Sequence, residues 1–183
     1  MIACHQMPPD LNEAAKYIAF EMFHLRYYAE VFEKCPAPRR FRSVFGERIG
    51  TAYEYSFLLH LRVLLDFFYR EPKPGSDDVW VGHFRSVMGF DEVYGETLCA
   101  PPEGALAISR HLNKRLAHFT EVRWKEKDQH IGMESYRLYW IALLKLIDKF
   151  EAALTGTPKD EFDRRMTAFR ETCDHGAYIR KPT

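Results

Sequence analysis

Residues 57–69, with the sequence FLLHLRVLLDFFY, constrain the fold of this chain more than any other segment. Only His60, Arg62 and Asp66 interrupt the apolar residues, so a helix formed here is apolar on nearly every side. Such a helix lies in the middle of a bundle, because each of its faces must be covered. The segment is also shorter than the roughly 18 residues that cross a bilayer, and it carries charges. We therefore expect a central buried helix and no membrane span.

A long helix is predicted before this segment. Asp10 followed by Glu13 is a capping-box pattern, which predicts a helix that starts near Leu11 and runs to about residue 33. Apolar residues at three- and four-residue spacing mark its buried side: Ala15, Ile18, Met22, Leu25 and Ala29. The prolines of residues 35–38 end the helix, because proline lacks the amide donor.

The same signals predict the remaining helices. The central helix starts at residue 42 or 48 and ends at residue 69, and others are expected at residues 78–88, 101–123, 133–154 and 158–172. The expected buried positions of the helix at 133–154 are Leu138, Ile141, Leu144, Ile147 and Phe150. No segment shows the sustained alternation of a strand. The sequence predicts an all-α fold, an antiparallel bundle of four main helices with one or two short ones.

Composition limits the class of protein. A length of 183 residues fits one domain over residues 1–183, and equal numbers of basic and acidic residues, 26 each, argue against a binder of duplex DNA. The four cysteines are dispersed, which fits neither a disulfide framework nor a zinc knuckle. The first residues do not resemble a secretory signal. We expect a cytoplasmic protein without a cofactor or a bound metal.

The charged residues of the central helix predict a polar site. Arg62 and Asp66 lie one turn apart, and an unpaired buried charge would cost several kcal/mol, so each needs a partner or access to water. The helix at 101–123 offers polar partners, which are Ser109, Asn113, His118, Thr120 and Arg123. One interpretation is a polar cleft in which a histidine transfers protons and an arginine holds a phosphate. The other is a structural network that fixes how the two helices pack.

Three stretches resemble a known group of proteins. They are LRVLLDFFY at residues 61–69, the pair Asp77-Asp78, and NKRLAHFTEVR at residues 113–123. Together they are similar to uncharacterised bacterial helical proteins of the HEPN domain group. The resemblance implies a helical bundle, often dimeric, and either metal-independent ribonuclease activity in defence or toxin–antitoxin systems or binding of RNA or partners. The family's catalytic arginine precedes its histidine by a short spacer, whereas here Arg110 is too far from His118 and Arg115 too near.

Three functions are therefore expected, in this order: a HEPN-like RNA-binding or RNA-processing protein of a bacterial stress or defence system, a non-catalytic helical interaction or dimerisation module, and, ranked last, a metal-dependent helical-bundle enzyme. Whether the chain is an enzyme stays open. RNA and a second copy of the chain are the expected partners. The candidate catalytic residues are His118, Arg62, Asp66, Asn113 and Arg115. His118 would transfer protons, since imidazole titrates near neutral pH, and Arg62 or Arg115 would orient the phosphate.

Overall fold

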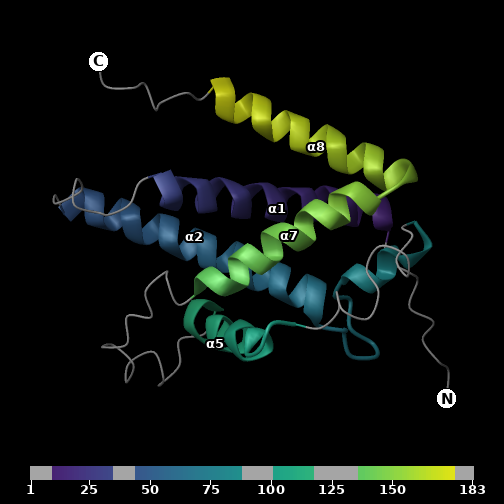
Figure 1. Ribbon diagram of the computed structural model, residues 1–183, viewed down its shortest axis with the longest axis horizontal. Coiled ribbons are helices and arrows are strands. Elements are labelled where there is room, and N and C mark those ends of the chain that lie inside the picture. The colour runs from purple at the N-terminus through teal and green to yellow at the C-terminus, as the bar shows by residue number, and fades with distance from the viewer. Residues whose placement is uncertain (1–9, 35–43, 88–100, 118–135, 176–183) are drawn as a thin grey trace.

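The computed structural model describes residues 10–34, 44–87, 101–117 and 136–175 (Figure 1). These residues form helices: α1 (Leu11–Lys34), α2 (Val44–Tyr69), the 3-10 helix η2 (Val81–Ser86), α5 (Ala105–Ala117), α7 (Arg137–Ala153) and α8 (Gly156–His175). No β-strand occurs among the described residues. The predicted all-α class is confirmed.

Helix α1 begins and packs largely as its sequence predicts. The carboxylate of Asp10 accepts hydrogen bonds from the backbone amides of Asn12 at 2.9 Å and Glu13 at 3.3 Å, which caps the first turn. The Glu13 side chain pairs with Lys16 instead of completing the capping box. All five positions of the predicted apolar stripe are buried: Ala15, Ile18, Met22, Leu25 and Ala29.

Helix α2 is the central helix. It packs against α1 and α5, and also contacts α7 and η2. Phe57, Leu61 and Leu65 have no exposed surface, so the expected burial of this segment is confirmed. Leu59 is the exception, with 44% of its surface exposed.

The helices pack in mixed directions. Contacts of Glu21 with His60 and of Tyr28 with Tyr53 show that α1 and α2 run antiparallel, as expected. Lys16 lies 3.7 Å from Glu161, and the ring of Phe23 lies 5.2 Å from that of Phe169, so α1 and α8 run parallel. Figure 1 shows α1 between α2 and α8. An entirely antiparallel packing therefore does not describe this chain.

Helix α7 buries a side that matches the predicted one only in part. Leu138 is 78% exposed and Ile141 37% exposed, whereas Trp140, Leu143 and Leu146 are buried. Both sets are apolar, so the sequence pattern alone offers two sides for burial, and packing against α2 selects one of them. The predicted burial of Ile147 and Phe150 is confirmed, but that of Leu138 and Ile141 is wrong.

Two predicted helices are shorter than expected in the described residues. The segment at 78–88 contains only η2, a single 3-10 helix of six residues. Helix α5 starts at Ala105, because Glu103 and Gly104 form a turn after the double proline. Gly104 has a φ of +81°, and a Cβ atom there would lie 2.9 Å from the hydroxyl of Tyr139. The predicted continuation of this helix to residue 123 lies outside the described residues.

An ionic network joins three helices. Arg26 of α1 bonds to Asp148 at 2.6 Å and to Glu151 at 2.9 Å, both on α7. Arg170 of α8 lies 4.0 Å from the other oxygen of Glu151. The network therefore connects the first helix to the last two.

Candidate functional site

Two polar contacts connect α2 with α5, and we call the four residues that make them the α2–α5 seam. Arg62 Nη1 donates a hydrogen bond to Asn113 Oδ1 at 2.8 Å, and Ser109 Oγ donates to Asp66 Oδ1 at 2.6 Å. Each helix contributes two residues one turn apart, which places their side chains on the same side of the helix. Three of the predicted site residues, Arg62, Asp66 and Asn113, are thus brought together at this seam.

The two charged residues of the seam, Arg62 and Asp66, do not neutralise each other. Asp66 accepts the bond from Ser109 and also lies 3.7 Å from Arg70. Arg62 bonds to a neutral amide, its Nε is buried without a hydrogen-bond partner, and no carboxylate of the described residues lies within ion-pair distance of it. Arg62 and Asp66 therefore do not pair with each other, and each has a neutral partner on α5. The seam holds a guanidinium whose charge the described residues do not neutralise.

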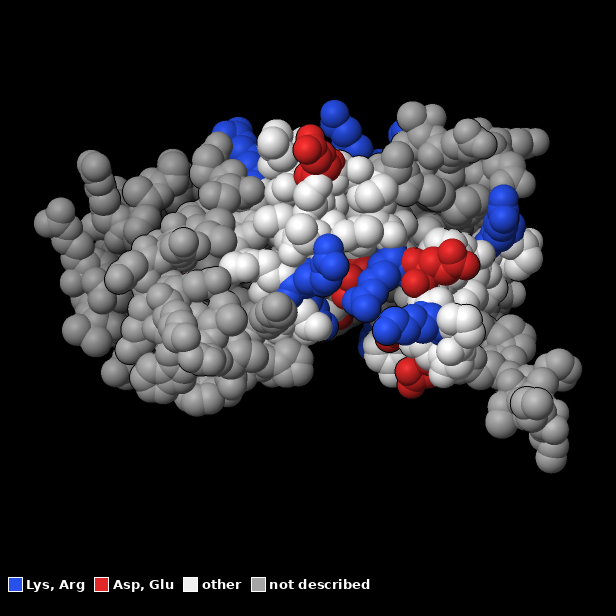
Figure 2. Space-filling model, turned by 90° about the horizontal axis from the view of Figure 1, so that it is seen from below, with Lys and Arg blue, Asp and Glu red and all other residues white. Residues whose placement is uncertain are grey.

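The other two predicted site residues are not positioned here. Arg115 belongs to α5, but its side chain is outside the described part of the structure, and so is all of His118. Figure 2 shows the α5 side of the molecule, where Lys and Arg side chains lie among Asp and Glu side chains. This described surface has mixed charge. An anion at the seam would therefore be bound by the few side chains next to it and not by a broad basic surface.

A second polar group, which the sequence did not indicate as a site, lies between α1 and α2. We call Glu21, His24, Tyr28 and His60 the histidine cluster. His60 is 7% exposed, and its Nδ1 donates to the carboxylate of Glu21 over 2.7 Å. The His24 and His60 rings stack with centroids 5.1 Å apart and planes inclined by 12°. The helical spacing of Glu21 and His24 was visible in the sequence, but their contact with His60 depends on how α1 packs against α2.

Two histidines have a lowered pKa. Burial is the main cause of the lowered pKa of His24, and the nearby His60 lowers it further, while Glu21 acts in the opposite direction. Burial also lowers the pKa of His83, whose Nδ1 accepts a hydrogen bond from the backbone amide of Trp80 at 3.2 Å. Both side chains therefore favour the neutral form at neutral pH.

Metal binding and membrane insertion find no support in the described ranges. No group of three or more His, Cys, Asp or Glu side chains in them is arranged to hold a metal ion. None of the described helices combines the length and the apolar character that a bilayer span requires.

Comparisons of the chain with protein-family models, with curated proteins and with solved structures give no match. The α2–α5 seam is therefore interpreted from its own geometry.

Proposed function

We propose that this chain is a HEPN-like RNA-binding or RNA-processing protein of a bacterial stress or defence system, acting in the cytoplasm. The observation that supports this function is the Arg62 guanidinium at the α2–α5 seam, which among the described residues has one neutral partner and a buried Nε without a partner. An uncompensated, partly buried cation is unfavourable by itself. A phosphodiester of RNA would supply the missing negative charge.

The neighbours of Arg62 suit this role. Asn113 uses its carbonyl oxygen to accept from Arg62, so its amide hydrogens remain available as donors. Asp66 is bonded to Ser109, and this contact helps to hold α5 against α2. Arg62 and Asn113 would together contact the phosphate, and Asp66 would act as a positioning residue.

Catalysis, if the protein cleaves RNA, depends on the segment that follows Asn113. His118 would transfer the proton, because an imidazole is the side chain that titrates near neutral pH without help. Arg115 would add a second guanidinium for the phosphate. These two assignments come from the sequence and its resemblance to the HEPN group.

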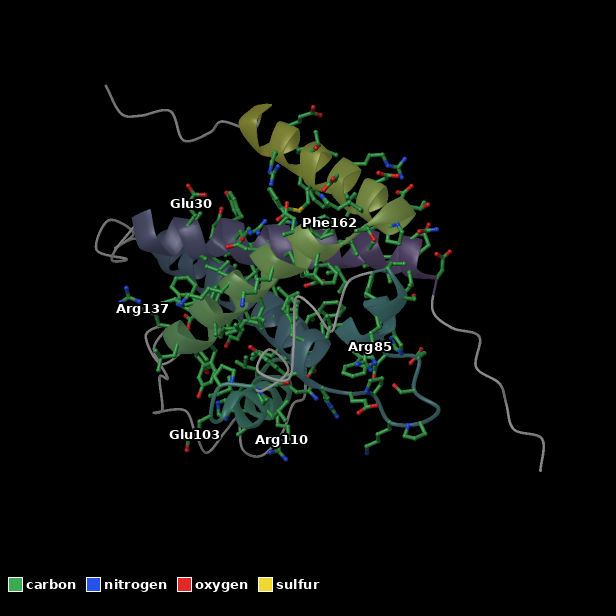
Figure 3. The ribbon with its side chains drawn as sticks, turned by 45° about the vertical axis from the view of Figure 1, so that its right-hand side comes forward. Glu30, Arg85, Glu103, Arg110, Arg137 and Phe162 are labelled. Atoms are coloured by element: carbon green, nitrogen blue, oxygen red, sulfur yellow. The ribbon has the colours of Figure 1, made fainter. Side chains whose placement is uncertain are left out.

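Binding of a fluorescent single-stranded oligoribonucleotide tests the proposal. Arg62→Met keeps a long side chain but removes the charge, and we expect affinity to fall about tenfold or more, the usual worth of a charge-assisted hydrogen bond. Arg110→Met is the matched control. Arg110 lies on α5, the helix that packs against Arg62, but its side chain is exposed and points away from the bundle (Figure 3). Equal affinities of the wild type and both variants, or no RNA binding by the wild type, would contradict the proposal.

Cleavage is measured separately with total RNA in the presence of a chelator. We expect His118→Ala to reduce cleavage by a factor of about 100 or more. A wild type that binds RNA but does not cleave it would identify a binding protein rather than a ribonuclease.

A second candidate function is a non-catalytic interaction or dimerisation module. The observation that favours it is the pair Leu138 and Ile141, which lie one turn apart on α7 and are both exposed. A homodimer would cover these side chains. Analytical ultracentrifugation tests this function: a dimer that Leu138→Lys converts to a monomer supports it, and a monomeric wild type contradicts it.

A further inference from the structure

We propose that the histidine cluster is a pH-sensitive contact, in which protonation of His24 loosens the C-terminal half of α8 from α1. The inference is independent of the proposed function, because the cluster lies between α1 and α2, away from the seam with α5. It depends on three features: the stacked imidazoles, a single carboxylate next to them, and the aromatic contact between His24 and α8.

Among the described residues, the cluster offers no free carboxylate to a protonated His24. Glu21 already accepts a hydrogen bond from His60 Nδ1. His24 has no such partner, since its Nδ1 is buried and makes no hydrogen bond. A proton on His24 would place a positive charge against the ring of His60, at the centroid separation of 5.1 Å.

The described residues around His24 supply no other negative charge. Tyr28 of α1 stacks on both histidine rings, and Tyr53 of α2 contacts Tyr28. On α8, the guanidinium of Arg165 lies over the ring of Phe169, with 5.3 Å between its Cζ and the ring centroid. It is a further cation next to the contact between His24 and Phe169. A proton on His24 therefore adds positive charge at a place where Glu21, the carboxylate that the described residues supply, is already bonded to His60.

Phe169 connects the cluster to α8. Its ring centroid lies 5.9 Å from that of His24 and 5.6 Å from that of Phe20. Helix α8 packs mainly on α1, and this contact is one of those between α1 and the C-terminal half of α8. Phe20, Phe23 and Phe169 meet the His24 ring in tilted or T-shaped arrangements. A cation on His24 would thus weaken an apolar contact on which the packing of α8 depends.

The sign of the effect follows from the lowered pKa of His24. The usual value is 6.5, and an imidazole released from the cluster regains it. Between the lowered pKa and 6.5, the loosened state binds more protons than the packed state. Packing of α8 is therefore complete above pH 6.5 and is weakened as the pH falls below this value.

Hydrogen exchange measured by mass spectrometry tests the proposal. We expect exchange in peptides from the C-terminal half of α8, corrected for the intrinsic pH dependence, to rise about tenfold between about pH 7.5 and about pH 5.5, a change typical of coupled equilibria. Peptides from α7 serve as the internal reference. His24→Phe keeps an aromatic ring but cannot be protonated, so the rise should be absent in this variant.

His83 provides the matched control, because burial lowers its pKa as well and it lies in η2. His83→Asn keeps an acceptor for the Trp80 amide and should leave the response of α8 unchanged. NMR titration of His24 in the wild type gives a measurement that needs no variant: its midpoint should coincide with the rise in exchange. An α8 that responds equally in His24→Phe, does not respond in the wild type, or responds at a pH where His24 does not titrate would overturn the proposal.

Discussion

At the scale of single residues, backbone conformation and close contacts restrict which residue a position accepts. Gly104 has a positive φ and lies against Tyr139, whose hydroxyl donates to the carbonyl of Glu103 at 3.1 Å. The turn before α5 therefore suits glycine for two reasons, the left-handed backbone and the lack of space for a side chain. The sequence showed the double proline that precedes α5 but not this turn, because the position of Tyr139 depends on the packing of α7.

Gly104→Ala should destabilise the protein by about 1 to 3 kcal/mol, since alanine is strained at this φ and its Cβ collides with Tyr139. Urea denaturation measures the change in the free energy of unfolding. Gly75→Ala is the control, because Gly75 also has a positive φ, of +87°, but has no atom within 4 Å of an added Cβ. A larger loss at Gly75 than at Gly104 would show that the contact with Tyr139 contributes nothing.

Residue-scale prediction of the site from sequence was partly successful. The charges of Arg62 and Asp66 predicted that both side chains need partners, and the partners on α5 were among those considered. The sequence did not show that Arg62 takes an amide and Asp66 a hydroxyl, because this choice depends on the register of α5 against α2. A register shifted by one turn would place Ser109 opposite Arg62, or Asn113 opposite Asp66, but not both.

At the scale of helices, apolar periodicity predicts which segments are helical better than which side they bury. The stripe of α1 was predicted correctly, because its aliphatic residues recur at three- and four-residue spacing along one side of the helix. Helix α7 is apolar on two sides, and only packing distinguishes them. On the buried side of α7, the ring of Phe150 contacts three other rings. They are those of Phe67, Phe84 and Phe162, at centroid distances of 5.6, 5.4 and 6.1 Å. Figure 3 shows Phe162 on the side of α8 that faces the rest of the bundle.

Phe150→Ala should therefore lower the free energy of unfolding by about 3 to 5 kcal/mol, because it removes a fully buried ring that connects α7 with three other helices. Leu138→Ala is the matched control on the same helix, and its effect should stay below about 0.5 kcal/mol. Thermal and urea denaturation give both values. Similar losses for the two variants would mean that α7 is rotated from the position described here.

At the scale of the whole molecule, contacts between distant parts of the chain hold the helices together. The ionic network of Arg26 with Asp148 and Glu151 joins α1 to α7, and Arg170 adds α8. No pattern in the sequence indicates these pairs, since more than a hundred residues separate Arg26 from its partners. The charges alone would equally suit a solvent-exposed surface.

Arg26→Met should destabilise the fold by about 1 kcal/mol at low ionic strength, because Asp148 and Glu151 both lose the partly buried guanidinium that pairs with them. The loss should shrink when the salt concentration is raised to about 1 M, where exposed charges are screened. Urea denaturation at both ionic strengths checks this. Arg164→Met is the control, since Arg164 pairs only within α8 and should have little effect at either salt concentration.

The parallel arrangement of α1 and α8 also determines how the molecule resists mechanical force. The start of α1 and the end of α8 lie at opposite ends of this helix pair (Figure 1). A pull between them slides α1 along α8, so contacts such as Lys16 with Glu161 and Phe23 with Phe169 are loaded at the same time. Two antiparallel helices would instead peel apart one contact after another. The first helix and the last helix thus form a joint loaded in shear.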